Sequence, residues 1–142
     1  MPLVTTLNGS KLVKVPSSKN KIKWDKPSCS IFQTTIKAFL RPYWEFKIGV
    51  CEEFKIPGSR LRCDFLCFGA KIAVEASGAQ HFEFNPFFHN NSQANFLASI
   101  KRDDKKRQWL TLNGFEIIEL IESDVPKLSA EFILEKFGVD IK

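Results

Sequence analysis

The sequence lacks any apolar run long enough to cross a membrane, and its N-terminus lacks the apolar segment of a secretory signal. We therefore expect an intracellular, cytoplasmic protein without a membrane partner. Only two histidines occur in 142 residues, and no two cysteines have the CxxC spacing that is typical of structural zinc sites. We expect the four cysteines to be buried as small apolar side chains rather than bound in disulfides or a zinc site.

The composition is that of one folded domain with a substantial core. Hydrophobic residues make up 44% of the 142 residues, and 14 residues are phenylalanine. A chain of this length can build one core but is short for two. The formal net charge of +5 is compatible with a polyanionic partner but does not identify one.

Residues 1–27 differ in composition from the rest of the chain. They contain a single acid, Asp25, and six lysines, namely Lys11, Lys14, Lys19, Lys21, Lys23 and Lys26. We expect residues 1–27 to form a flexible, basic N-terminal arm with one short strand over 11–15. Two interpretations remain open. The arm follows the phosphates of a nucleic acid, with Trp24 stacked on a base, or it is a solvated terminus.

The rest of the chain alternates between helical and strand periodicity. A capping-box spacing at Ser30 begins a helix that we expect to end before Pro42. The further expected elements are strands over 46–56, 60–68, 71–77 and 115–121 and helices over 93–113 and 129–137. The resulting order, α-β-β-β-α-β-α, predicts an α/β fold with a small mixed sheet flanked by helices.

The most informative feature is a predicted hairpin that carries two acids. With a two-residue type II′ turn over 69–70, Asp64 faces Glu75 directly across the two strands. Directly opposed Cβ atoms lie roughly 4.5–5.5 Å apart, so two carboxylates at these positions repel each other. A divalent cation between them would remove the repulsion, which predicts a metal site. The alternative is an ordinary ion pair of either acid with one of three bases, Arg62, Lys71 and Arg107.

The predicted helix over 93–113 carries charges where apolar residues are expected. Its apolar stripe, which should pack on the sheet, consists of Phe96, Ile100 and Leu110. Asp103 and Arg107 fall in the same stripe, which indicates a functional role for Asp103. The bases within 101–106 make this helix a candidate for phosphate contacts. The alternative is a solvated basic helix in which Asp103 pairs with Arg107.

Three segments resemble the PD-(D/E)XK nucleases, and more narrowly the very-short-patch-repair (Vsr) endonucleases and small Vsr-like nuclease domains. The segments are CDF with Asp64, VEASGAQH from Val74 to His81, and FLASIKRDDKKRQWLTLNGFEIIEL from Phe96 to Leu120. VEASGAQH is similar to the VEVDGxQH run of the Vsr-like domains. The resemblance implies a restriction-endonuclease-like α-β-β-β-α-β core in a nuclease domain over residues 28–142.

The resemblance also implies a metal-dependent site built on paired acids. Asp64 and Glu75 would bind Mg²⁺ or Mn²⁺, with the backbone carbonyl of Ala76 as a further ligand. His81 and Asp103 match positions that lie near the attacking water or a second metal. The expected catalytic residues are therefore Asp64, Glu75, His81 and Asp103.

Three positions depart from the family pattern. Ser77 stands where the family has a lysine two residues after the second acid, and it also replaces the Asp of VEVDG. Gln33 occupies a helix position where relatives often carry Glu. Glu53 is a candidate additional acid, because the turn that follows it would place it opposite Arg62 and on the face of Asp64.

The predicted function is hydrolysis of phosphodiester bonds by a Mg²⁺-dependent, DNA-associated endonuclease or nickase. The alternative is a non-catalytic nucleic-acid-binding module on the same fold. The bases expected to contact nucleic acid are Lys19, Lys21, Lys23, Arg62, Lys101, Arg102, Lys105 and Arg107. With one site per chain, a cut of both DNA strands would require a homodimer or two nicking events. Mismatched, branched, duplex and single-stranded substrates all fit the sequence.

Overall fold

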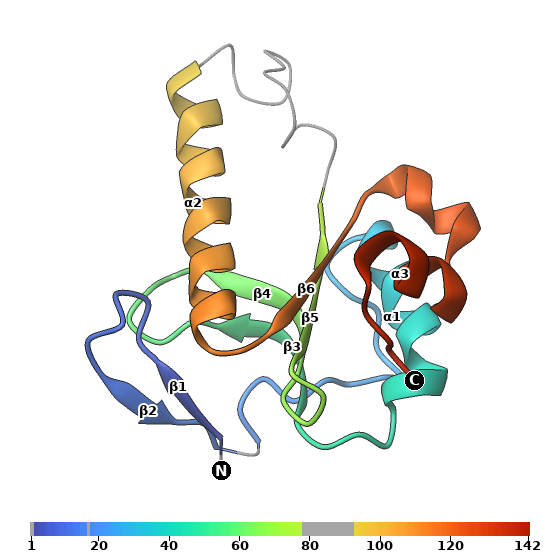
Figure 1. The fold of residues 1–142 in the computed structure, drawn as a ribbon, viewed down its shortest axis with the longest axis horizontal. Coiled ribbons are helices and arrows are strands. Elements are labelled where there is room, and N and C mark those ends of the chain that lie inside the picture. The colour runs from blue at the N-terminus through green and yellow to red at the C-terminus, as the bar shows by residue number, and fades with distance from the viewer. Residues whose placement is uncertain (1, 17, 78–92) are drawn as a thin grey trace.

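The computed structural model describes residues 2–16, 18–77 and 93–142, which form an α/β fold around a mixed sheet of four strands (Figure 1). The elements are β1 (Leu3–Thr5), β2 (Leu12–Lys14), α1 (Ile31–Trp44), β3 (Val50–Lys55), β4 (Arg62–Cys67), β5 (Ile72–Ala76), α2 (Gln93–Leu112), β6 (Glu116–Leu120), the 3₁₀ helix η2 (Glu122–Lys127) and α3 (Ala130–Phe137). The sheet has the order β3-β4-β5-β6, with β5 and β6 parallel and the other neighbours antiparallel. From α1 onward, the α-helices and strands follow the predicted order, and η2 is an additional element between β6 and α3.

Buried side chains cover both faces of this sheet. On one face, Phe65 and Val74 pack with α1 and α3. On the other face, Leu66 packs with α2 through Trp109 and with the β1–β2 hairpin through Val4. Figure 1 shows the same division, with α1 and α3 on one side of the sheet and α2 with β1–β2 on the other. The strands that carry the acids therefore lie between two apolar layers.

Helix α1 begins where its capping pattern predicts and ends later than expected. The hydroxyl of Ser30 accepts a hydrogen bond from the backbone N–H of Gln33 at 3.1 Å. The helix continues through Pro42 to Trp44, so the expected end before Pro42 is wrong. Proline costs the last turn one hydrogen bond, but burial of Leu40 and Trp44 in the core offsets that loss. The following strand is shorter than the expected 46–56, because residues 45–49 form turns that close the helix.

The predicted register of the acid-bearing hairpin is confirmed. Phe65 pairs with Val74 across β4 and β5. Asp64 and Glu75 are the next residues along the two strands, so they oppose each other as expected. Because side chains alternate between the faces of a sheet, a shift by one residue would have placed the two acids on opposite faces.

The turn of this hairpin differs from the expected type II′ turn. The residue with a left-handed backbone is Lys71, with a φ of 57°, whereas Gly69 has no positive φ. A Cβ atom added at Gly69 would lie 2.8 Å from the carbonyl oxygen of Ile48. Glycine at this position is therefore required by the close approach of the chain before β3, and not by backbone conformation.

The four cysteines are free thiols, and three of them are buried as expected. Burial raises the pKa of Cys51 to about 11, which keeps this thiol neutral at physiological pH. Cys29 departs from the expectation because it is exposed. No helix in the described part of the chain is long and apolar enough to span a membrane.

The N-terminal segment is not the flexible arm that its composition predicts. Its described residues form the β1–β2 hairpin and then run along β3, where the backbone N–H of Ile22 donates to the carbonyl oxygen of Val50 at 3.1 Å. The indole N–H of Trp109 donates to the carbonyl oxygen of Thr5 at 2.7 Å. Although lysines dominate the composition of this segment, a few of its apolar residues complete the core, among them Val4 with 0% exposure. This burial is the physical reason for the correction.

Shortening a buried side chain of β1 should destabilise the whole protein if the segment is part of the fold. We expect Val4→Ala to lower the free energy of unfolding by about 1–3 kcal/mol, through lost burial and a residual cavity. The neighbouring Leu3 is 51% exposed, so Leu3→Ala serves as the control and should cost about 0.5 kcal/mol or less. Urea denaturation measures both values, and equally small effects would show that the segment does not belong to the core.

Candidate functional site

A row of four acids crosses the sheet, one on each strand. Glu75 of β5 pairs with Glu119 of β6, and Asp64 of β4 opposes Glu75. Glu53 of β3 lies level with Asp64 of β4. The residues on either side of Glu53 pair with the residues on either side of Asp64. Like charges on adjacent strands destabilise a sheet, so this row requires compensating groups from elsewhere in the fold.

The amide of Gln33 bridges the two acids nearest to α1. Its nitrogen donates to Oε1 of Glu53 and to Oδ1 of Asp64, at 3.0 Å in each case. One amide group can serve both acceptors because it carries two N–H protons. The thiol of Cys29 lies 3.6 Å from Oε1 of Glu53, and the negative charge of Glu53 raises the pKa of Cys29.

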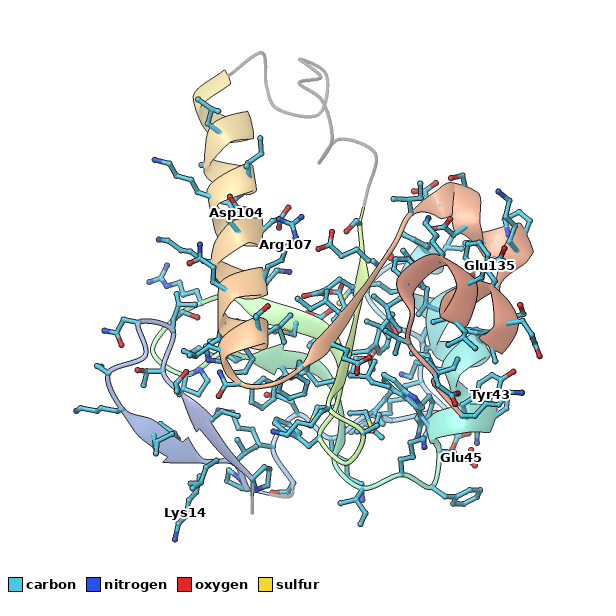
Figure 2. The ribbon with its side chains drawn as sticks, in the orientation of Figure 1. Lys14, Tyr43, Glu45, Asp104, Arg107 and Glu135 are labelled. Atoms are coloured by element: carbon cyan, nitrogen blue, oxygen red, sulfur yellow. The ribbon has the colours of Figure 1, made fainter. Side chains whose placement is uncertain are left out.

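Two basic side chains of α2 contact the acids in the other half of the row. The ammonium of Lys106 lies 3.3 Å from Oε1 of Glu75. The guanidinium of Arg107 donates to Glu119 through two nitrogens and to Asp104 at 2.9 Å. Figure 2 shows Arg107 directed from α2 toward the sheet. These ion pairs tie α2 to β5 and β6.

Backbone hydrogen bonds hold the two central acids in a fixed relation. The N–H of Asp64 donates to Oε2 of Glu75 at 3.0 Å, and the N–H of Ala76 donates to Oδ2 of Asp64 at 2.7 Å. Each carboxylate therefore accepts a hydrogen bond from the strand opposite its own. The two side chains are positioned by β4 and β5 themselves, which are among the best buried elements of the fold.

Glu75 is the most deeply buried acid of the row, with 7% of its surface exposed. Burial, reinforced by the charge of Asp64, raises the pKa of Glu75 to about 8. Its Oε1 atom is buried without a hydrogen bond in the described structure and has only the ion pair with Lys106. Burial of Lys106 disfavours its charged form, but the charges of Glu75 and Asp64 outweigh burial and raise the pKa of Lys106. Lys106 therefore remains a cation beside the acid pair.

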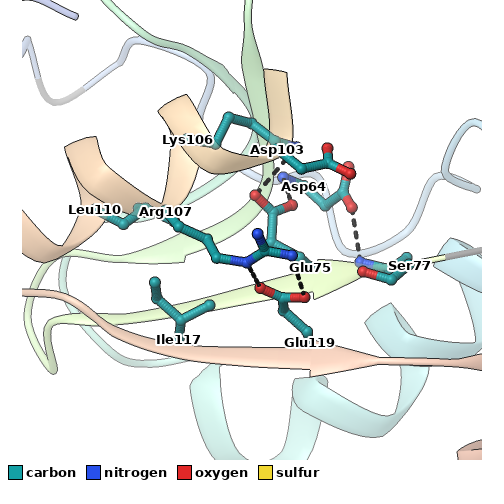
Figure 3. Close-up of a pocket in the computed structure, with 10 residues that line it drawn as sticks. Asp64, Glu75, Ser77, Asp103, Lys106, Arg107, Leu110, Ile117 and Glu119 are labelled. Carbon is teal, nitrogen blue, oxygen red and sulfur yellow. Dashed lines mark hydrogen bonds and ion pairs between the residues drawn. The ribbon is translucent and has the colours of Figure 1, made fainter. Parts of the chain in front are cut away.

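The acid pair opens into a small pocket between α2 and the sheet (Figure 3). The pocket has a volume of about 40 Å³, which accommodates a small ion with a water molecule but not an organic substrate. Asp103 of α2 lines the same pocket, and Figure 3 shows its carboxylate directed into it together with that of Asp64. Asp64, Glu75 and Asp103 therefore share one opening with Lys106.

The donor atoms of this pocket suit a hard divalent cation. Among the described residues, Oε1 of Glu75 has no hydrogen-bond partner, and each oxygen of Asp64 retains a lone pair after accepting one hydrogen bond. Within the described ranges, no three His, Cys, Asp or Glu side chains lie close enough together to hold a metal ion. Asp64 and Glu75 thus fit a cation as a pair of carboxylate ligands, which is the usual protein contribution to a Mg²⁺ site that keeps several waters.

The structure brings together four of the site residues expected from the sequence, namely Asp64, Glu75, Ala76 and Asp103. His81 lies outside the described residues. Glu53 is close to the site as expected, but Lys55 and not Glu53 is opposite Arg62. The expected pairing of Glu53 with Arg62 is wrong because residues 56–61 form a longer loop than a two-residue turn, which shifts the register by two residues.

Lys106 was expected only as a surface base of α2, yet it is the base that contacts the acid pair. Its spacing contains the signal, because Asp103, Lys106 and Leu110 are separated by three and four residues and share one face of a helix. Ser77, at the position of the family lysine, lines the same pocket. An ammonium group is therefore present at the acids, but it comes from α2. The ion pair expected as the alternative to a metal also exists, with Lys106 in place of Arg62, Lys71 or Arg107.

The bases expected to contact nucleic acid lie on two surfaces. The exposed ones on α2 are Lys101, Arg102 and Lys105, and those on the N-terminal segment are Lys21 and Lys23. Arg62 is exposed at the start of β4, where its carbonyl oxygen accepts from the ammonium of Lys106 at 3.2 Å. Lys19 lies over the ring of Phe54, 5.4 Å from its centre. Arg107 is engaged by its ion pairs within the site.

Removing the ionisable group of Glu75 should remove part of the pH dependence of stability. Its pKa is about 8 in the folded protein and roughly 4.3 in an unfolded chain, so between these values the folded state keeps a proton that the unfolded state has lost. The stabilisation is complete below the unfolded pKa and is lost as the pH rises through the folded one, at up to about 1.4 kcal/mol per pH unit. We expect wild type to lose free energy of unfolding relative to Glu75→Gln between about pH 5 and pH 8. Urea denaturation in EDTA measures this difference, and parallel pH profiles would contradict it.

Two proteins of invertebrate viruses are similar to parts of the chain. A segment of 67 residues, 46% of the chain, is 40% identical to the uncharacterized protein 033L of Invertebrate iridescent virus 3 and covers 33% of that protein. A segment of 50 residues, 35% of the chain, is 42% identical to the uncharacterized protein 307L of Invertebrate iridescent virus 6 and covers 25% of it. The similarity therefore spans a third or less of either viral protein. No known protein family and no solved structure matches the chain.

Proposed function

We propose that this protein is a Mg²⁺- or Mn²⁺-dependent DNA endonuclease or nickase with a restriction-endonuclease-like, Vsr-like PD-(D/E)XK core. The observation that carries the proposal is the opposed pair of Asp64 and Glu75 with the ammonium of Lys106 3.3 Å from Glu75. Two acids that can bind a cation, beside a positively charged side chain, are groups that can promote hydrolysis of a phosphodiester. The order of helices and strands and the expected register of the hairpin support the same assignment.

Asp64 and Glu75 would hold the cation, which would polarise the scissile phosphate and lower the pKa of a bound water. Asp64 is oriented for this task by Gln33 and by the backbone N–H of Ala76. Hydrolysis forms a bond between the water oxygen and phosphorus and breaks one phosphorus–oxygen ester bond. Asp103, which lines the same pocket, would accept the proton of the attacking water.

Lys106 would act on the phosphate once Glu75 binds a cation. In the structure its ammonium is the counter-charge of Glu75, at 3.3 Å. A flexible four-carbon stem allows this ammonium to move to a phosphate oxygen, where it would offset the charge that develops in the transition state. Lys106 would thus take the role that a lysine at position 77 has in the family, from a different element of the fold.

DNA would lie along the exposed bases of α2, the helix that also carries Asp103 and Lys106 into the pocket. Lys101, Arg102 and Lys105 are exposed on this helix, and phosphates are the groups that such bases contact most often. Within the described part of the chain, Asp64 and Glu75 form one proposed cation site, so a single encounter would produce a nick. A cut of both strands would require a homodimer or a second encounter.

A non-catalytic DNA-binding module is the second candidate, and one observation favours it. The positions that a cation would neutralise already have partners, because Lys106 pairs with Glu75 and Gln33 bridges Glu53 and Asp64. Such a site could be stable without metal. DNA binding without turnover would then be the activity of the same surface.

Plasmid nicking tests the proposed activity. We expect the wild-type protein to convert supercoiled plasmid to the open circle with Mg²⁺ or Mn²⁺ and not with EDTA. Asp64→Asn keeps the size of the side chain but removes its charge, so it should lower the rate by at least about a hundredfold. Lys106→Ala should lower it by a similar factor, because the counter-charge for the phosphate is lost.

Lys105→Ala is the matched control. It removes a charge next to Lys106 on the same helix, but the side chain of Lys105 is exposed. Its effect should be confined to DNA affinity and should disappear at saturating protein concentration. Wild-type rates in Asp64→Asn would refute the assignment of the site. Folded wild-type protein that binds plasmid and does not cleave it would favour the non-catalytic module.

A further inference from the structure

A second, larger groove lies at the end of the sheet away from the acid pair. It has a volume of about 660 Å³ and is lined by the N-terminal segment, the loop between α1 and β3, and the turn after β4. From Asp64 to Cys67, the last residue of β4 before this turn, the strand advances by about 10 Å. Figure 2 shows Glu45, which lines the groove, well separated from Arg107 of the acid site.

The groove exposes an unusual amount of apolar surface at one edge. Phe46 is 94% exposed and Ile48 is 82% exposed, and both line the groove. Both residues fall within the expected strand over 46–56, but they lie in the turns between α1 and β3. Trp24, half-buried, contributes a second aromatic ring to the lining. Adjacent exposed apolar groups on a groove, unlike scattered ones, mark a binding surface.

The charges around the groove identify the kind of partner. Lys21 and Lys47 line it, and Lys23 is exposed beside it. The acid among its lining residues, Glu45, is held in an ion pair with Arg41. The surface therefore combines aromatic rings with lysines that have no ion pair among the described residues.

We propose that this groove binds a single-stranded segment of DNA, with bases stacked on Phe46 and Trp24 and phosphates contacted by Lys21 and Lys47. Rings interleaved with lysines are the combination that single strands require, because every base can stack and every nucleotide carries a charge. A duplex hides the faces of its bases and could not use the rings.

The role of the groove in catalysis rests on the proposed nuclease function. A strand that occupies it would reach the acid pair only around the surface of the molecule, because α1 and α3 cover one face of β4 and α2 with the β1–β2 hairpin covers the other. The substrate class is then DNA with an unpaired segment a few nucleotides from the scissile bond, such as a flap, a branch or a distorted mismatch. Intact duplex would bind through α2 alone and more weakly.

Binding of oligonucleotides in EDTA tests the groove without any cleavage. Labelled oligo-dT and a duplex of equal length are titrated with wild type and with Phe46→Ala, by fluorescence anisotropy. Loss of one stacking partner should weaken binding of the single strand by about tenfold and leave duplex binding unchanged.

Lys47→Ala should reduce the dependence of log affinity on log salt by roughly 0.7 for the single strand. Trp44 and Trp109 are buried, so quenching of tryptophan emission by oligo-dT should report Trp24.

Leu134→Ala is the control, because this residue is an exposed apolar side chain on α3, away from the groove. It should leave both affinities unchanged. Equal binding of oligo-dT by wild type and Phe46→Ala would overturn the proposal, and so would a change that appears only in the oligomeric state by sedimentation. Loss of single-strand binding in Phe46→Ala, together with no cleavage by wild type, would retain the groove and reject the nuclease.

Discussion

A row of four acids across the sheet is the constraint on which the arrangement of the helices depends, because each acid that ionises repels its neighbours. A side chain from α1 or α2 contacts each acid. Gln33 donates hydrogen bonds to Glu53 and Asp64, whereas Lys106 and Arg107 form ion pairs with Glu75 and Glu119, respectively. Without these contacts the row would destabilise the sheet at its centre. The apolar layers hold α1 and α2 in place, and the polar contacts then set the position of each helix relative to the acids.

This dependence couples the fold to the chemistry. Gln33 lies in the first turn of α1, which the Ser30 cap fixes, and Lys106 lies one turn before the buried residues at the end of α2. The side chains that balance the charges are therefore held by the same elements that build the core. A buried acid with an unsatisfied oxygen is costly for stability, which is typical of sites where function and not stability selects the residue.

The acid pair could be predicted from the sequence because hairpin register follows from local spacing and from alternation. The order of the helices and strands from α1 onward was predictable for the same reason. The N-terminal hairpin was not, since Val4 and Val15 become informative only when Trp109 of α2 lies against them. The contact of Lys106 with the acid pair could not be predicted, because three consecutive basic residues give no local sign of which side chain points toward the sheet. The register of Glu53 depended on the length of a loop, which alternation does not specify.

Calorimetric titration with Mn²⁺ tests the central claim most directly, because it asks whether the acid pair binds a cation without requiring the correct DNA substrate. The account predicts that wild type binds Mn²⁺ and that Asp64→Asn binds it at least about tenfold more weakly, since one of two charged ligands is lost. Lys105→Ala should bind like wild type. Absence of Mn²⁺ binding by folded wild-type protein, or equal affinity in Asp64→Asn, would contradict the account.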